Sequence, residues 1–243
     1  MATNDWWINA KSGERHTLIL KSGLEIMSGE TSLPVRDAVK RTFIYSIYRQ
    51  LADRKVLRDW QARGRPAPPP QFIKQRTVKE YARRFHINTF VETGTYLGDM
   101  VHACRNTFRR IFSVEVDGQL YQRAQDRFRN MAHISIVHGD SADLLHVILE
   151  TVTSPCLFWL DGHHSGGITG RGRQDTPIRR ELDCILAHRV AGHVILIDDA
   201  RCFTGHNDYP TLEELRQIVA NKDLNRICEV RDDIVRVHDR ENA

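Results

Sequence analysis

Features that would assign this chain to a special class of protein are scarce. No run of apolar residues approaches the ~18 that a membrane-spanning helix requires. The opening Met-Ala-Thr-Asn-Asp-Trp-Trp lacks the basic stretch and the apolar run of a secretory signal. We therefore expect a soluble protein with no membrane partner.

Cysteine is also sparse and shows no pairing pattern. The chain has five cysteines, an odd number, widely spaced and without a Cys-x-x-Cys pair: Cys104, Cys156, Cys184, Cys202 and Cys228. Isolated cysteines in expected helices and strands are typically small buried thiols. This usage favours a reduced, cytoplasmic protein.

A large excess of charge of one sign is absent as well. Lys and Arg number 35 against 31 Asp and Glu, and the pI is ≈ 8.9. This excess is too small and too scattered to argue for nucleic acid, which we do not expect as a partner, and it suits a small polar or anionic molecule equally well. With 243 residues, the chain is long enough for one full α/β domain and an extension.

The first 70 residues are expected to be that extension. Two short apolar runs, 16–20 and 24–27, flank Lys-Ser-Gly and predict a hairpin. From Pro34 to about residue 63, apolar residues at helical spacing predict a long amphipathic helix, which would be a packing arm, a homodimer contact or a lid. The proline-rich stretch 64–70 then breaks the chain, so we place the main domain at 71–243.

Strand and helix patterns alternate along the main domain. The expected strands are 88–92, 110–115, 133–138, 155–161, 193–199, 226–230 and 234–237; the expected helices are 75–85, 97–107, 119–131, 141–150, one begun by Pro177, and 211–221. This alternation predicts an α/β domain, doubly wound around a mostly parallel seven-stranded sheet. The last two strands are close enough to form an antiparallel hairpin across Asp232 and Asp233.

The domain is organised around residues 90–99, Phe-Val-Glu-Thr-Gly-Thr-Tyr-Leu-Gly-Asp. An apolar strand ends there in Glu92, and Gly94 and Gly98 allow a turn and a close ligand at the start of a helix, whose free N–H groups favour a carboxylate. The spacing Gly-x-x-x-Gly is not the Gly-x-Gly-x-x-Gly of a dinucleotide site. By itself the motif is equally consistent with a plain strand-to-helix turn.

Acidic residues follow one strand after another. They are Glu92, Glu115, Asp140, Asp161, Asp198 and Asp199. A single such residue is usually a helix cap or a turn residue. Because the carboxyl ends of parallel strands share one edge of a sheet, where ligands bind at the topological switch point, the series predicts one crevice lined with carboxylates.

From about residue 75 to 240, this order of strands and acidic residues resembles the class I S-adenosylmethionine-dependent methyltransferases. The resemblance implies a Rossmann-like methyltransferase fold and S-adenosylmethionine (SAM) as cofactor. It assigns the methionine part of the cofactor to the first motif, Glu92, Gly94, Thr95 and Gly98; the ribose hydroxyls to the two oxygens of Glu115; and the adenine ring to Asp140 and Ser141.

Within that superfamily, Asp161 with Asp198 and Asp199 resembles the metal-dependent O-methyltransferases, including the macrocin O-methyltransferase type. The resemblance implies that these three carboxylates bind Mg²⁺ or another hard divalent cation. The glycine-rich stretch 162–175 is longer than in that type, and would be a lid that orders on binding or an exposed linker. The implied reaction is O-methylation of a small polar molecule, sugar or natural product.

O-methylation requires the acceptor hydroxyl to lose its proton. A bound metal lowers the pKa of a coordinated hydroxyl, so Asp161 is expected to act in catalysis as well. His163 or His164 is the candidate base, because the pKa of histidine lies near neutrality. Substrate orientation, metal ligation and a plain loop position are the alternatives for both.

Arg201 directly follows the Asp pair, which places it at the mouth of the expected crevice. With Arg171, Arg173, Arg179 and Arg180 it could clamp an anionic group of the substrate through the guanidinium fork. The alternative for each arginine is a solvated surface charge.

Two other functions stay open from the sequence. One keeps the fold and the cofactor but methylates without a metal, or acts on nitrogen or on a macromolecule; full activity in a chelator would distinguish it. The other is a non-catalytic or nucleotide-binding α/β module, although the missing Gly-x-Gly-x-x-Gly argues against NAD.

Overall fold

The computed structural model describes residues 17–19, 25–27, 43–161 and 176–240. The chain divides into two compact units, Met1–Val56 and Leu57–Ala243. The division that the sequence suggests after residue 70 stays a prediction. Among the described residues, none of the helices is both long enough and apolar enough to cross a membrane.

The first unit contains a small antiparallel pair of strands. β1 (Thr17–Ile19) pairs with β2 (Glu25–Met27), with Leu18 opposite Ile26. Helix α2 (Phe43–Ala62) begins in this unit and ends in the second. The expected start of that helix at Pro34 lies outside the described residues.

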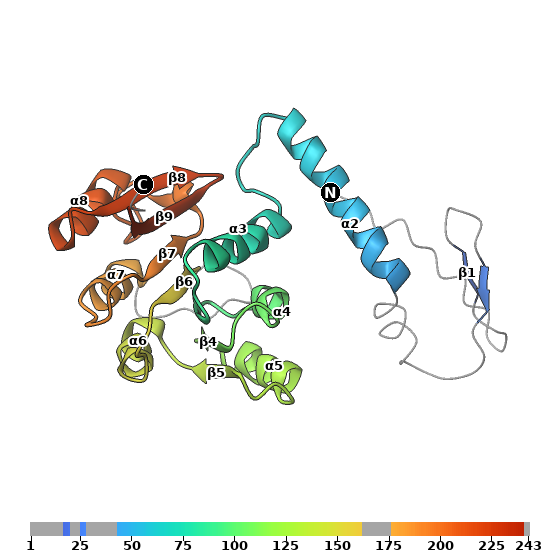
Figure 1. The fold of residues 1–243 in the computed structure, drawn as a ribbon, viewed down its shortest axis with the longest axis horizontal. Coiled ribbons are helices and arrows are strands. Elements are labelled where there is room, and N and C mark those ends of the chain that lie inside the picture. The colour runs from blue at the N-terminus through green and yellow to red at the C-terminus, as the bar shows by residue number, and fades with distance from the viewer. Residues whose placement is uncertain (1–16, 20–24, 28–42, 162–175, 241–243) are drawn as a thin grey trace. The chain divides into compact units, whose positions relative to one another are not determined.

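The second unit is built on a seven-stranded sheet in the order β5-β4-β3-β6-β7-β9-β8 (Figure 1). Its strands are β3 (Thr89–Thr93), β4 (Arg110–Glu115), β5 (Ile134–His138), β6 (Cys156–Leu160), β7 (Val194–Ile197), β8 (Arg226–Arg231) and β9 (Ile234–Asp239). The first five strands of that order run parallel, while β9 pairs antiparallel with β7 and with β8. The predicted sheet and its final hairpin are confirmed.

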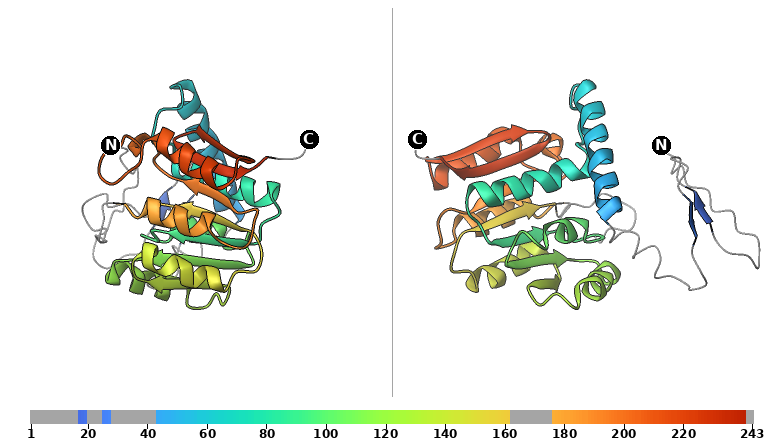
Figure 2. Two further views of the ribbon diagram at one scale, coloured as in Figure 1. Left: turned by 90° about the vertical axis from the view of Figure 1, so that its left-hand side faces the viewer. Right: turned by 45° about the vertical axis from the view of Figure 1, so that its right-hand side comes forward.

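Helices cover both faces of this sheet (Figures 1 and 2). They are α3 (Gln71–Arg84), α4 (Asp99–Cys104), α5 (Gly118–Phe128), α6 (Ser141–Glu150), α7 (Ile178–Leu186) and α8 (Leu212–Lys222). α3, α4 and α5 supply Val78, Met100 and Phe128 to one buried cluster. α6, α7 and α8 supply Leu145, Leu182 and Leu215 to the other. Every residue of β6 and β7 is buried, as expected for strands covered on both faces.

Helix α4 is shorter than the pattern predicts. The sequence predicts a helix over 97–107, but the structure begins it at Asp99, after Gly98 at φ 74°. This left-handed conformation is incompatible with helix, and it is one that glycine adopts readily. Helix α3, in contrast, begins earlier than predicted, at Gln71 directly after Pro70.

The strand order reverses direction between β3 and β6. β3 lies between β4 and β6, and the chain builds outward from it on both sides. In the register of the sheet, Thr93, Leu160 and Ile197 stand side by side at the carboxyl ends of β3, β6 and β7. The residue that follows each of them therefore faces the same edge of the sheet, at its switch point.

Candidate active site

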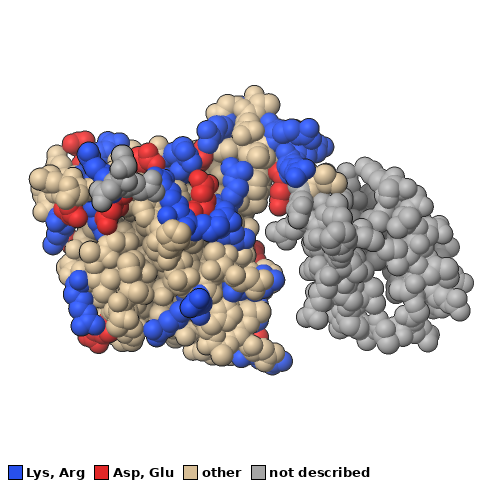
Figure 3. Space-filling view, in the orientation of Figure 1, with Lys and Arg blue, Asp and Glu red and all other residues tan. Residues whose placement is uncertain are grey.

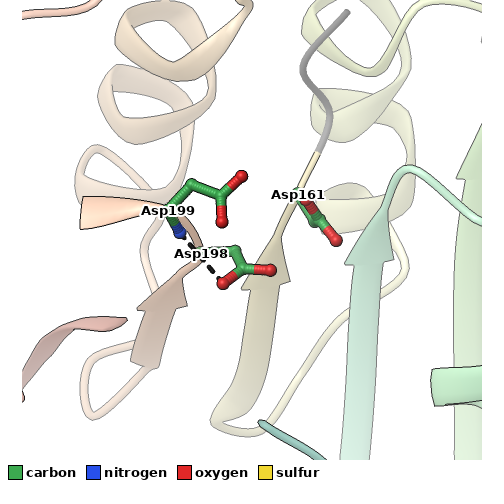
Figure 4. Close-up of side chains that lie close together, drawn as sticks. All are labelled: Asp161, Asp198 and Asp199. Carbon is green, nitrogen blue, oxygen red and sulfur yellow. Dashed lines mark hydrogen bonds between the residues drawn. The ribbon is translucent and has the colours of Figure 1, made fainter. Parts of the chain in front are cut away.

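Three carboxylates meet at this edge (Figure 4). Asp161 follows β6, while Asp198 and Asp199 follow β7, and each offers an oxygen within 4.8 Å of the others. The backbone fixes the arrangement, because the Asp198 N–H donates to the Leu160 carbonyl at 3.0 Å. The structure therefore brings together the predicted metal ligands; a bound metal stays a prediction.

Asp199 adopts a left-handed backbone conformation, φ 56° and ψ 48°. Its N–H donates to Oδ1 of Asp198 at 2.9 Å, and the next N–H, of Ala200, donates to the Asp233 carbonyl at 2.9 Å. A non-glycine residue in this region costs free energy and persists where its surroundings enforce it, often at functional sites. The turn directs the Asp199 carboxylate back toward Asp198 (Figure 4).

Two carboxylates of the cluster are buried. Asp198 is 3% exposed and Asp199 is 6% exposed. Burial, and next the charge of Asp161, raise the pKa of Asp198 to about 7. A cation at this position would therefore reduce the electrostatic repulsion between the carboxylates.

Lys74 of helix α3 supplies such a charge and was not predicted. Its Nζ donates a hydrogen bond to Oδ2 of Asp198 and lies 3.8 Å from Oδ1 of Asp199. The sequence held a signal for it: Lys74 precedes Val78 by four residues and lies on the same face as buried Tyr81. A lysine on the apolar face of a helix is a candidate for a buried ion pair.

Arg201 turns toward the same cluster. Its guanidinium donates to Oδ1 of Asp199 at 2.7 Å and also pairs with Asp233 at the tip of the β8–β9 hairpin. Substrate binding by Arg201 stays a prediction, since its described partners are carboxylates of the protein.

The other predicted cationic and basic residues do not all fall in the described part of the chain. Arg179 pairs with Glu214 at 3.0 Å, and Arg180 pairs with Asp143 at 2.6 Å, both on the exposed surface of α7. His163, His164, Arg171 and Arg173 lie outside the described residues. On the face shown in Figure 3, Lys and Arg alternate with acidic and uncharged residues rather than forming one continuous patch.

The glycine turn after β3 lies next to this cluster in the sheet. Gly94 and Gly98 have φ values of 86° and 74°, and a Cβ on Gly98 would stand 2.8 Å from the Phe128 ring. Glycine at 98 is therefore required by the turn and by its packing on α5. Thr95 is 3% exposed, and its hydroxyl lies 2.6 Å from that of Ser113.

Glu92 is buried beneath that turn. It is 2% exposed, and its Oε2 accepts a hydrogen bond from the Ser113 hydroxyl. Burial raises the pKa of Glu92 well above its ordinary value. Ser113 links Glu92 to Thr95 in the turn, and the contact of Glu92 with a cofactor stays a prediction.

Glu115 is the last residue of β4, and Asp140 follows β5, the next strand along the sheet. Glu115 accepts the Tyr96 N–H at 2.7 Å and the Asp117 N–H at 3.0 Å, so its carboxylate joins the glycine turn to the loop after β4. Asp140 caps helix α6 by accepting the Ala142 N–H at 2.9 Å, and Ser141 is the first residue of that helix. These hydrogen bonds do not test whether Glu115, Asp140 and Ser141 contact a cofactor, so those contacts stay predictions.

A small pocket opens beside the acidic cluster. Asp161, Asp198, Glu181 and Tyr209 line it, together with apolar side chains. Glu181 is 1% exposed, and burial raises its pKa to about 7. Glu181 was not predicted as a site residue, although it stands on the apolar stripe of α7 between Ile178 and Ile185. The pocket thus combines hydroxyl and carboxyl groups with an apolar wall.

Comparison with known proteins supports the fold. The sequence matches no protein-family model and no curated protein. It is similar in structure to the O-methyltransferase TomG from Streptomyces achromogenes, involved in tomaymycin synthesis and solved with SAM: 14% identity, TM-score 0.52, covering 75% of this chain and 86% of that one.

Two further solved structures agree. An O-methyltransferase from Bacillus cereus in complex with SAH has 14% identity and a TM-score of 0.51, covering 77% of this chain and 90% of that one. The SAH-bound methyltransferase PaMTH1 from Podospora anserina has 15% identity and a TM-score of 0.50, covering 76% and 88%. The predicted fold class is therefore confirmed: the chain has the Rossmann-like fold of these methyltransferases.

Proposed function

We propose that this chain is a SAM-dependent methyltransferase that methylates a hydroxyl group of a small polar acceptor with the help of a divalent cation. The observation that carries the proposal is the meeting of Asp161, Asp198 and Asp199 at the switch point of a methyltransferase fold. The similar structures bind SAM or SAH, and this supports the same cofactor here.

The cofactor would bind along the carboxyl ends of β3, β4 and β5. Glu115 would hold the ribose hydroxyls, because a carboxylate with two oxygens suits a vicinal diol. Its two hydrogen bonds from backbone N–H groups fix the carboxylate without using every lone pair. The turn through Gly94, Thr95 and Gly98, supported from below by Glu92, would hold the methionine part, and Asp140 and Ser141 would border the adenine.

The donor set of the acidic cluster fits a hard cation. Three carboxylates within 4.8 Å offer the oxygen ligands that Mg²⁺ prefers, and leave coordination positions for other oxygens. When bound, such a cation lowers the pKa of an alcohol and makes it a better nucleophile. Asp161, on the pocket wall, would orient the acceptor hydroxyl, while His163 or His164 would accept its proton and Arg201 would bind an anionic group of the acceptor.

Calorimetric titration of SAM into the purified protein tests the cofactor. We expect micromolar binding that is lost in Glu115→Ala and retained in Glu150→Ala, which removes an exposed carboxylate from the end of α6. Circular dichroism of both variants would show whether they are folded. No binding of SAM to the unmodified protein would disprove the methyltransferase function.

A second titration with Mg²⁺ tests the metal. A separate heat of binding that disappears in Asp198→Asn and in EDTA is expected. The Asn side chain has nearly the same shape, so the variant removes the charge without opening a cavity.

A methyltransferase that uses no metal is the second candidate, and Lys74 favours it. The Lys74 ammonium already balances part of the charge of the cluster through Asp198 and Asp199. In that case SAM would bind as before, Mg²⁺ would give no heat, and methyl transfer would be unchanged in EDTA.

A further inference from the structure

Lys74 reaches the acidic cluster with its ammonium nearly removed from solvent. Its side chain is 13% exposed, and the side chain of its hydrogen-bond partner Asp198 is 1% exposed. A second carboxylate oxygen, of Asp199, lies 3.8 Å from Nζ. Lys74 is therefore a buried ion-pair partner and not a solvated surface charge.

Core packing places Lys74 there. Helix α3 presents Lys74, Val78 and Tyr81 on one face, and the last two are 0% and 2% exposed. The helix packs on α4 and on β6, the strand that leads into Asp161. Because the apolar residues of α3 fix the helix, its first turn holds Lys74 over the carboxylates.

The charges at the cluster show what a cation would have to displace. Among the described residues, Lys74 pairs with Asp198 and Asp199, and Arg201 pairs with Asp199 and also with Asp233. A divalent cation at these carboxylates would therefore meet Lys74 at Oδ2 of Asp198. The same cation beside an unmoved Lys74 would be repelled by it at short range, and would compete with it for Oδ2 of Asp198.

We propose that Lys74 is the tethered counter-ion of the acidic cluster, and that a divalent cation binds there by displacing it. The inference rests on the cation site of the proposed function. Lys74 is a positioning residue in this scheme: it holds the carboxylates together in the absence of a cation and lowers their affinity for one.

Titration with Mn²⁺, followed by the electron paramagnetic resonance of the free ion, tests the competition directly. Lys74→Met keeps the length and the apolar stem of the side chain but loses the charge. It should bind Mn²⁺ about tenfold more tightly than the unmodified protein, because the repulsion and the competing hydrogen bond are gone. Lys74→Arg keeps the charge and should bind no more tightly than the unmodified protein.

Lys79→Met is the matched control, since it makes the same substitution on the same helix, at a half-buried lysine. Its Mn²⁺ affinity should equal that of the unmodified protein. Equal affinities in Lys74→Met and the unmodified protein would overturn the inference, even if Asp198→Asn shows that the cation binds at the cluster. Absence of Mn²⁺ binding in every variant would overturn both the inference and the metal-assisted mechanism. Binding of SAM is tested separately, by its own titration.

Lysine acetylation of the unmodified protein gives a second readout that needs no variant. A divalent cation should increase the labelling of Lys74 by an N-hydroxysuccinimide ester of acetic acid, measured by peptide mass spectrometry, and leave Lys79 unchanged. Unchanged labelling of Lys74 at a Mn²⁺ concentration that saturates the protein would overturn displacement. This readout also serves if Lys74→Met does not fold.

Discussion

The carboxylate of Asp233 holds Arg201 at two points. Its Oδ1 accepts the backbone N–H of Arg201 at 2.8 Å, and its Oδ2 pairs with the guanidinium. The same guanidinium donates to Asp199 at 2.7 Å, and the Asp233 carbonyl accepts the Ala200 N–H. The tip of the β8–β9 hairpin therefore fixes the backbone that directly follows Asp198 and Asp199.

Two substitutions of Asp233 should show how much its side-chain contacts contribute to the free energy of unfolding. Asp233→Ala should lower the free energy of unfolding by about 2–3 kcal/mol, because the Arg201 N–H loses its acceptor and alanine is strained at the φ of 59° found here. Asp233→Asn keeps an acceptor and tolerates this φ, so it should cost about 1 kcal/mol. Urea unfolding of the three proteins measures both effects, and an equal midpoint for all three would contradict the role of the turn.

Glu92 should make stability fall as the pH rises. Burial raises its pKa well above the ordinary value of 4.5, so above pH 4.5 the unfolded chain releases a proton that the folded protein keeps. This contribution to stability is complete below pH 4.5 and is lost as the pH rises toward the folded pKa. Glu92→Gln is neutral at every pH and should become progressively more stable than the unmodified protein above pH 4.5. Urea unfolding from pH 4 to pH 8 checks this; a constant difference would mean that the pKa of Glu92 is not raised in the folded protein.

His193 should make the stability of the protein fall as the pH decreases. It is 1% exposed, its Nδ1 accepts the Cys156 N–H at 2.9 Å, and burial lowers its pKa to about 4. Between pH 6.5 and pH 4 the unfolded chain binds a proton that the folded protein excludes, so stability should fall by up to about 3 kcal/mol as the pH decreases. His193→Gln keeps an acceptor for Cys156 and should lack this loss.

The control for His193 is His146→Gln, at an exposed histidine of α6. Its pH dependence of unfolding should follow that of the unmodified protein. A loss of stability of the same size in His193→Gln would show that another group takes up the proton.

Gly98 should tolerate no side chain, for two separable reasons. Gly98→Ala adds a Cβ at a φ of 74° and places it 2.8 Å from the Phe128 ring. Gly64→Ala adds a Cβ at a φ of 80° with no atom within 4 Å, so it measures the backbone strain alone, about 1–2 kcal/mol. Gly98→Ala should exceed this value by about 1–3 kcal/mol because of the contact. Equal losses in thermal or urea unfolding would mean that Phe128 moves away freely.

Local patterns in the sequence were sufficient to predict the sheet. Strands such as Arg110–Glu115 and Cys156–Leu160 are short apolar runs bounded by turns, and their alternation with helices restricts the connections to right-handed parallel crossovers. The acidic residues after the strands could be placed together for the same reason. Asp161 and Asp198 are neighbours because β6 and β7 are neighbours in register.

The ends of helices were less predictable. The left-handed residues Gly98 and Asp199 each set the chain in a new direction, and neither conformation follows from spacing alone. At Asp199 the conformation is held by Asp233, a residue from another part of the chain.

The order of strands and helices and the meeting of carboxylates at one edge can therefore be predicted from the sequence, because periodicity and strand ends are local properties of the chain. The cations that meet those carboxylates cannot, because they depend on tertiary packing. Lys74 and Asp198 are 124 residues apart, and Arg201 and Asp233 are 32 apart. Their pairing depends on how α3 and the β8–β9 hairpin pack against the sheet. That packing results from many apolar contacts between residues that are far apart in the sequence.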